Sequence, residues 1–207
     1  MHVRIGRSTV PLENIERAIA TFPDRIGPTI RKHPGNVGVA ALIDRPTGKV
    51  VVVTYWDSEQ SLKASEQLVQ ETRSKAAAEL GLKLGDIDTY EVTLQERAQA
   101  PKSGTFVRIN TGQGSPDQID AATRELRQGL SEVLTLKGFR ALIAGVNKSN
   151  GKFIISSVWD TVADREASEK AVASLRQRVT DTAKSAPIQI EKYEAVYVDI
   201  PVRAGVS

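Results

Sequence analysis

The sequence has no cysteine and only two histidines, His2 and His33, among its 207 residues. Without cysteine the chain has no disulfide, thiolate metal site, iron–sulfur cluster or cysteine nucleophile. Two histidines are too few for a three-histidine metal centre, and they restrict serine–histidine–aspartate catalysis to two positions. No acidic cluster has the spacing of metal ligands either. We therefore expect no metal site.

An excess of one charge is also lacking. The chain carries 28 lysines and arginines against 25 acidic residues, which gives a net charge of +3. A nucleic-acid-binding protein concentrates basic residues on one face, and this balance argues against a nucleic-acid partner. Aromatic residues make up only 5% of the chain, which is too few for extensive stacking on bases.

Long apolar runs are absent as well. No segment approaches the roughly 18 consecutive apolar residues of a membrane-spanning helix. Residues 1–7 lack the apolar core of a signal peptide. The sequence therefore predicts a soluble, cytoplasmic protein with no membrane partner.

What the chain does contain is an internal repeat. The strand-like segment that ends in Trp56 resembles the one that ends in Trp159, 103 residues later. Near the N-terminus the separation becomes 104 residues, as between Arg4 and Arg108. The 103-residue separation also pairs Gly48-Lys49 with Gly151-Lys152, Ala64-Ser65-Glu66 with Ala167-Ser168-Glu169, Arg73 with Arg176, and Tyr90-Glu91 with Tyr193-Glu194.

Each half predicts the order strand, helix, strand, strand, helix, strand. Alternating apolar residues mark the strands, and apolar residues at helical spacing mark the helices. In the first half, strands cover residues 2–7, 36–43, 50–56 and 88–95, and helices cover 11–26 and 58–80. In the second half, strands cover 106–111, 139–146, 152–159 and 189–200, the last longer than its counterpart, and helices cover 115–134 and a long segment after 161.

Particular residues mark the ends of these helices. Ser58 is placed to cap the long helix of the first half, and Gly81 is placed to end it. Ser115 is expected to cap the helix that follows it, and Thr161-Val162-Ala163-Asp164 is close to a capping box. Pro23 is expected to end or kink the first helix.

This βαββαβ order is typical of the ferredoxin-like unit, with two helices on one face of an antiparallel sheet. A polar linker, residues 99–104, separates a repeat at 1–98 from a repeat at 105–207. Residues 50–56 are apolar on both faces, so the face without helices also needs cover. We therefore expect an α+β fold of two tandem ferredoxin-like repeats, packed sheet to sheet as an intramolecular dimeric α+β barrel.

The motif at the strand ends, Trp56-Asp57-Ser58-Glu59 and Trp159-Asp160-Thr161, resembles the dimeric α+β barrel superfamily. More narrowly, the chain resembles the antibiotic-biosynthesis monooxygenase-like proteins, which are usually single units that dimerise through their sheets. Fused two-unit members exist, and the resemblance covers nearly the whole chain, twice. It implies a ligand cavity in each unit, between sheet and helices. Self-association beyond the fused pair stays open, and the motif indicates the fold far better than the activity.

That family includes cofactor-free oxygenases, quinol monooxygenases and haem-degrading enzymes. The haem-degrading subgroup uses a helix histidine, a second tryptophan and an asparagine on the first strand. Here Glu66 and Glu169 stand at the place of the second tryptophan, and no histidine lies on either long helix. Asn110 could match the asparagine, but Gly6 is its repeat counterpart. The resemblance therefore argues against haem degradation and implies chemistry without flavin or metal.

The first strand of each half carries an arginine. Arg4 and Arg108 alternate with apolar residues, which would place a cation in each cavity to orient a phenolate, enolate or carboxylate. The alternative is an exposed arginine or an ion pair with a glutamate such as Glu91 or Glu194. Asn110 shares the face of Arg108, so the second half alone has this polar pair.

Other repeated residues have two interpretations each. Trp56 and Trp159 either form the wall of a pocket or pack in the core. Tyr90 and Tyr193 either donate to a substrate carbonyl or bridge core and rim. His33 is either a base or an exposed loop residue.

Two functions follow. The first is a cofactor-independent monooxygenase acting on a small aromatic or quinol-type substrate, whose anion the protein orients and stabilises. The second is a non-catalytic small-ligand-binding or structural protein on the same fold, which the scarcity of histidine favours. The catalytic candidates are Arg108, Asn110 and Trp159, and the substrate-binding candidates are Arg4, Trp56, Tyr90, Tyr193 and His33.

Overall fold

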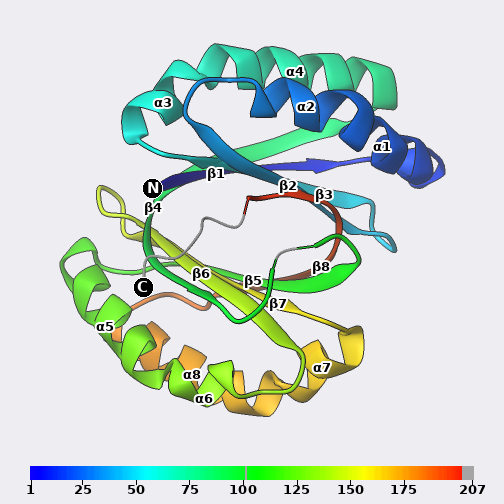
Figure 1. The fold of residues 1–207 in the computed structure, drawn as a ribbon. Helices are drawn as coiled ribbons and strands as arrows, with labels where there is room; N and C mark the ends of the chain where they lie inside the picture. Colours follow the sequence, from blue (N-terminus) through cyan, green and yellow to red (C-terminus); the bar gives the residue numbers. More distant parts are fainter. Residues whose placement is uncertain (101, 202–207) are drawn as a thin grey trace. The chain divides into compact units, whose positions relative to one another are not determined.

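The computed structural model describes residues 1–100 and 102–201. The first repeat has the predicted order of strands and helices (Figure 1). Its elements are β1 (His2–Thr9), a 3-10 turn (Leu12–Asn14), α1 (Ile15–Thr21), a π-helical turn (Phe22–Ile26), α2 (Gly27–Arg31), β2 (Asn36–Asp44), β3 (Lys49–Trp56), α3 (Glu59–Ala64), α4 (Glu66–Leu80) and β4 (Lys83–Arg97).

The second repeat follows the same order. Its β-hairpin turns at the predicted residues 147–151, as the first turns at 44–48. Its elements are β5 (Thr105–Gln113), a 3-10 turn (Pro116–Gln118), α5 (Ile119–Gly129), α6 (Ser131–Leu134), β6 (Phe139–Asn147), β7 (Lys152–Trp159), α7 (Val162–Ala167), α8 (Glu169–Thr182) and β8 (Gln189–Asp199).

The chain forms two compact units that do not coincide with the two repeats. Unit 1 contains Met1–Thr89 and the last strand from Tyr193 on, and unit 2 contains Tyr90–Ala100 and Thr105–Lys192. β4 and β8 therefore each run from one unit into the other. The strand order is β4-β1-β3-β2-β8 in unit 1 and β8-β5-β7-β6-β4 in unit 2. Each repeat thus gives most of its last strand to the sheet of the other unit.

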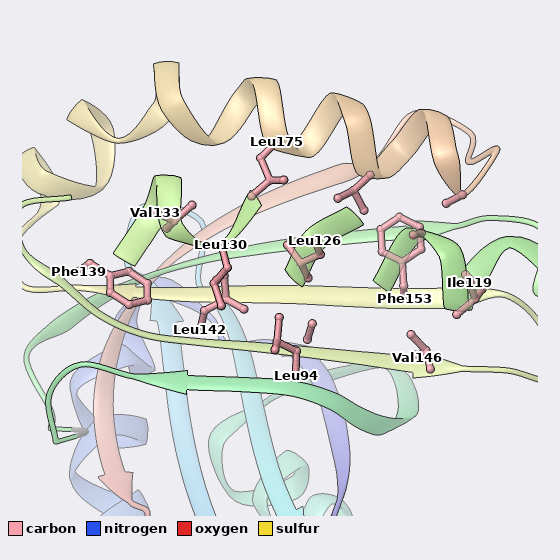
Figure 2. Packing of buried hydrophobic residues seen from close by; sticks show 14 of the residues in the cluster. Leu94, Ile119, Leu126, Leu130, Val133, Phe139, Leu142, Val146, Phe153 and Leu175 are labelled. Carbon is pink, nitrogen blue, oxygen red and sulfur yellow. The ribbon is translucent and has the colours of Figure 1, made fainter. Parts of the chain in front are cut away.

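Helices cover one face of the sheet in each unit. In unit 1, α1–α4 lie over β1–β3, and in unit 2, α5–α8 lie over β5–β7 (Figure 1). The core of unit 2 fills the space between these layers with aliphatic and aromatic side chains (Figure 2). They come from β4, α5, α6, β6, β7 and α8, and include Leu94, Leu126, Val133, Phe139, Leu142, Phe153 and Leu175.

The helix ends follow the predicted chemistry, but the sequence did not indicate the breaks at Ser65 and Ser168. The Ser58 hydroxyl accepts from the Ser61 N–H, and Gly81 ends α4 with φ of 70°. The Thr161 hydroxyl accepts from the Asp164 N–H at 3.0 Å. The single helix predicted over residues 58–80 is wrong, because Ser65 separates α3 from α4. The buried Ser65 hydroxyl donates instead to a carbonyl of α3.

Pro23 interrupts the first helix as expected, since α1 ends at Thr21 and a wider π-helical turn from Phe22 accommodates a residue without an N–H. Three other expectations are wrong. Ser115 makes no side-chain cap. β4 begins at Lys83 rather than at residue 88. The prediction missed its first residues because they are exposed and show no apolar alternation. β8, with 11 residues, is therefore shorter than β4, with 15.

The exchanged strand ends are held by buried or half-buried arginines. In unit 1, Arg31 donates to Asp199 on β8 at 3.0 Å. In unit 2, Arg140 donates to Asp160 and to the Gln99 side chain just after β4. Unit 1 also packs Tyr197 of β8 against Phe22, with ring centroids 5.2 Å apart. Each unit therefore needs the strand that the other repeat supplies.

We expect residues 1–98 expressed alone not to form a stable monomer. Their unit 1 sheet lacks β8, and an unpaired apolar strand edge associates with other chains. Size-exclusion chromatography with light scattering should show dimers or larger species. Mixing with residues 99–207 should restore one cooperative melting transition. A monomeric fragment that melts cooperatively would contradict the strand exchange.

Candidate functional site

Described residues of each unit line a small cavity between its sheet and its helices. The unit 2 cavity has a volume of about 40 Å³, and the unit 1 cavity about 70 Å³. A water molecule needs on the order of 10–15 Å³, whereas pockets for drug-sized ligands start near roughly 300 Å³. An aromatic ring therefore enters either cavity only when side chains around it move.

The repeated arginine of the first strand holds the break between two helices. In unit 2, Arg108 Nη1 donates to Ser168 Oγ at 3.0 Å, and Nη2 donates to the Arg165 carbonyl. In unit 1, Arg4 makes the same bonds to Ser65 Oγ at 2.6 Å and to the Leu62 carbonyl at 2.7 Å. A cation is favourable at such a helix C-terminus because the last carbonyls lack partners. The occurrence of this arginine in both repeats therefore has a structural explanation, because each copy holds a helix break in place.

Burial sets the electrostatics of Arg108. Its side chain is 1% exposed, and this burial lowers the pKa of the guanidinium, while the nearby Glu169 carboxylate acts in the opposite direction. Burial likewise lowers the pKa of Arg4, and Glu66 opposes it. A guanidinium stays charged in proteins, so unit 2 contains a buried cation beside an apolar cavity.

Both tryptophans are fully buried at the ends of their strands. Trp159 Nε1 donates to Ser157 Oγ at 3.0 Å, and its ring meets Phe139 edge to face at 5.6 Å. Trp56 Nε1 donates to Thr54 Oγ1 at 2.9 Å. Neither tryptophan is among the described residues that line the cavities. Ser157 and Thr54 do line them, so each indole positions a hydroxyl of a cavity wall.

The remaining candidates lie away from the cavities. Tyr90 belongs to unit 2 and Tyr193 to unit 1, and each is 3% exposed. His33 packs edge to face on Trp56, at 5.4 Å between ring centroids, and its Nδ1 lies 3.1 Å from the Pro34 carbonyl. None of the three is among the described residues that line either cavity.

Asn110 is the feature that marks the unit 2 cavity. It lines this cavity, and it is 7% exposed. Its Nδ2 donates to the Ile155 carbonyl at 3.2 Å, whereas its Oδ1 and Arg108 Nε have no partner among the described residues. Leaving a buried polar group unsatisfied costs about 1–3 kcal/mol. β5 of unit 2 therefore carries an unused acceptor on Asn110 and an unused donor on Arg108.

Unit 1 lacks this pair because Gly6 stands at the place of Asn110. A Cβ at Gly6 would lie 3.6 Å from Arg73 Nε, so the Arg73 side chain occupies the space. Arg73 Nη2 donates to the carbonyls of Arg7 and Gly85, at 2.8 and 2.9 Å. The cavity residues described in unit 1 include no unsatisfied buried polar atom.

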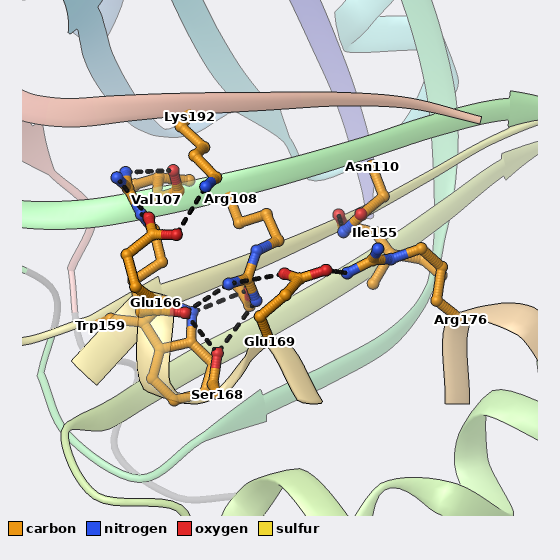
Figure 3. Close-up of polar contacts among 12 residues, drawn as sticks. Val107, Arg108, Asn110, Ile155, Trp159, Glu166, Ser168, Glu169, Arg176 and Lys192 are labelled. Carbon is orange, nitrogen blue, oxygen red and sulfur yellow. Dashed lines mark hydrogen bonds and ion pairs between the residues drawn. The ribbon is translucent and has the colours of Figure 1, made fainter. Parts of the chain in front are cut away.

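Arg176, the unit 2 counterpart of Arg73, pairs with a carboxylate instead. Its Nη2 lies 2.8 Å from Glu169 Oε1, while Glu169 Oε2 lies 3.1 Å from Arg108 Nη2 (Figure 3). Sequence reasoning did not select Arg176 for the site. The signal in the sequence that could have identified Arg176 was its alignment with Arg73 in the other repeat. This alignment gives each half a second arginine that could accompany the arginine of the first strand.

Within residues 1–100 and 102–201, no group of three or more histidine, aspartate and glutamate side chains is arranged to hold a metal ion. Over the same residues, no helix combines the length and the apolar character needed to cross a membrane.

Replacing Arg108 with methionine should lower the free energy of unfolding by about 3–5 kcal/mol, because it leaves Glu169 and the Arg165 carbonyl without their buried partner. Chemical denaturation measures this change. Arg178→Met is the matched control, since Arg178 pairs with Glu125 and Glu132 at the surface and should leave the midpoint nearly unchanged. Equal effects of the two substitutions would contradict the role given to Arg108.

Similarity to known proteins agrees with this architecture. Residues 1–79 match the family model of the antibiotic biosynthesis monooxygenase domain. The protein Rv2557 of Mycobacterium tuberculosis is 24% identical over 150 residues, which are 72% of this chain and 66% of that protein. Rv2558 of the same organism is 22% identical over 191 residues, 91% of this chain and 80% of that protein. The match thus spans just under two thirds of the length of Rv2557.

Solved structures share the fold. An anthrone oxidase-like protein superposes with a TM-score of 0.70 at 15% identity, over 100% of this chain and 96% of its own. A monooxygenase-like protein from Listeria innocua superposes with a TM-score of 0.57 at 13% identity, over 93% of both chains. The α+β fold of tandem ferredoxin-like repeats predicted from the sequence is confirmed. The predicted family resemblance is confirmed too: the first repeat matches the antibiotic biosynthesis monooxygenase family, and the whole chain has the fold of monooxygenase-like proteins.

Proposed function

We propose that unit 2 is a monooxygenase-like site, acting without metal or flavin on a small aromatic or quinol-type substrate in the cytoplasm. One observation carries this proposal: Asn110 Oδ1 and Arg108 Nε are buried at an apolar cavity with no partner among the described residues. Such atoms impair stability, and they are explained if a ligand satisfies them.

The pair suits a phenol or quinol hydroxyl. The hydroxyl donates a hydrogen bond to Asn110 Oδ1, and Arg108 Nε–H donates to an anionic oxygen of the substrate. The substrate loses its proton to bulk water, because an amide oxygen is too weak a base to take it, and the positive charge of Arg108 stabilises the resulting anion inside a low-dielectric cavity. That anion passes one electron to O₂; the substrate radical and superoxide combine to a ring hydroperoxide, which loses water to leave a quinone, so no further reductant is consumed. Trp159 acts indirectly, because its indole N–H fixes the Ser157 hydroxyl in the cavity wall.

Unit 1 contributes structure rather than chemistry in this proposal. Arg73 fills the space beside Gly6, and Arg4 has the same helix-holding bonds as Arg108. Substrate contacts of Arg4, Trp56, Tyr90, Tyr193 and His33 stay predictions.

A non-catalytic binding or structural role is the second candidate. It is favoured by the small cavities and by the structural bonds that both arginines and both tryptophans already make. Such a protein would hold a small aromatic ligand and consume no oxygen.

Asn110→Leu should lower oxygen uptake with hydroquinone and small phenols by about 100-fold, because the substrate hydroxyl loses its acceptor. The fold should persist, since an apolar side chain of similar shape replaces an unsatisfied amide oxygen. An oxygen electrode measures the rate. Gly6→Ala, at the repeat counterpart, is the control and should leave the rate unchanged. If Asn110→Leu and Gly6→Ala give equal rates, unit 2 is not the site.

Native mass spectrometry of gently purified protein separates the two candidate functions. We expect one small molecule per chain, lost in Asn110→Leu and retained in Gly6→Ala. Oxygen uptake with the retained molecule supports the monooxygenase. Retention together with no oxygen uptake for any aromatic tested would favour the binding protein.

A further inference from the structure

Glu169 bridges the two arginines of the unit 2 cavity. Its Oε1 lies 2.8 Å from Arg176 Nη2 and its Oε2 lies 3.1 Å from Arg108 Nη2 (Figure 3). Both arginines line the cavity, whereas Glu169 is not among its described lining residues. A carboxylate of the protein itself therefore joins the two cavity cations.

This carboxylate leaves the cluster positively charged. Arg108 and Arg176 carry two positive charges, and Glu169 carries one negative charge. The neighbouring pairs, Arg165–Glu166 at 3.0 Å and Lys192–Glu166 at 2.6 Å, share a single carboxylate as well. Burial depresses the pKa of Arg108, and Glu169 acts in the opposite direction. A ligand with negative charge would relieve this imbalance.

The unused Arg108 Nε–H selects the kind of anion. Nε and Nη2 form one edge of the guanidinium, and a carboxylate binds such an edge with both oxygens. Glu169 meets this edge only at Nη2. A carboxylate coming from the cavity can use Nε and Nη2 together, whereas a phenolate has one oxygen to offer.

Asn110 selects what lies at the other end of the ligand. Its Oδ1 is an acceptor, so it repels a carboxylate and accepts from a hydroxyl. Residues 108 and 110 lie on one face of β5, which separates their backbones by about 6.6 Å. A benzene ring that carries a carboxylate and a hydroxyl at different positions offers one group to each residue.

We propose that the unit 2 cavity takes a hydroxylated aromatic carboxylate, whose carboxylate replaces that of Glu169 on Arg108 and Arg176 and whose hydroxyl donates to Asn110. This inference rests on the proposed function, since it names the substrate class of that site. The Glu169 side chain is 41% exposed although its Oε2 is buried, so displacement draws this oxygen out toward water. That movement also frees Arg176 and enlarges the cavity, which the ligand requires.

Isothermal titration calorimetry under nitrogen tests the proposal without turnover. The probes are 4-hydroxybenzoate, benzoate and phenol. In the wild-type protein, 4-hydroxybenzoate should bind about tenfold more tightly than benzoate or phenol. Glu169→Gln removes the competing charge and should tighten 4-hydroxybenzoate and benzoate by about tenfold while phenol stays unchanged. Glu66→Gln, the repeat counterpart in unit 1, is the control and should change none of the three affinities.

Arg176→Gln keeps the proposal falsifiable if Glu169→Gln does not fold. It should weaken both carboxylates by about tenfold and leave phenol unchanged. Phenol binding as tightly as 4-hydroxybenzoate overturns the proposal, and so do carboxylate affinities that neither substitution alters.

The binding experiments on the ligand class and the oxygen-uptake experiments on the proposed function can fail independently of each other. Oxygen uptake with hydroquinone but no preference for carboxylates would overturn the ligand class and keep the monooxygenase. Tight binding of 4-hydroxybenzoate without oxygen uptake would keep the ligand class and overturn the monooxygenase.

Discussion

In each unit, a buried guanidinium from the first strand donates to a carbonyl in the last turn of one helix and to the serine that separates this helix from the next. The break needs the arginine because helix ends leave carbonyls without partners. The arginine needs the break because a buried cation must be hydrogen-bonded. This mutual requirement fixes the helices over the sheet, and with them the cavity below. In unit 2 it also fixes which edge of Arg108 remains for a ligand.

One substitution on that common scaffold makes the two units different. Where unit 1 has Gly6, the Arg73 side chain fills the gap and bonds to backbone carbonyls. Where unit 2 has Asn110, the equivalent Arg176 turns to Glu169, and an amide oxygen is left at the cavity without a partner among the described residues. Among the described residues, the cavity of unit 1 therefore has only satisfied polar groups in its lining, whereas the cavity of unit 2 has two buried polar atoms without partners.

The sequence predicted the repeats, the order of their elements and the turns between them, because these depend on apolar periodicity and on local capping. It also placed Arg108 and Asn110 on one strand face. It did not indicate the break at Ser65, which depends on a hydrogen bond from a strand 61 residues away. Nor did it indicate the Arg176–Glu169 pair, because a long side chain chooses its partner only after the fold brings several within reach. The first residues of β4 were missed because exposed polar strands show no apolar alternation.

The exchange of last strands has a consequence for how the chain is made. Unit 2 lies almost entirely within Tyr90–Lys192, so it is complete before synthesis ends. Unit 1 begins first but cannot close its sheet until Tyr193 and the residues after it leave the ribosome. At typical rates of synthesis, the N-terminal strands wait on the order of ten seconds for their partner. During that interval the edge of β2 is open, and an open apolar strand edge pairs readily with other chains.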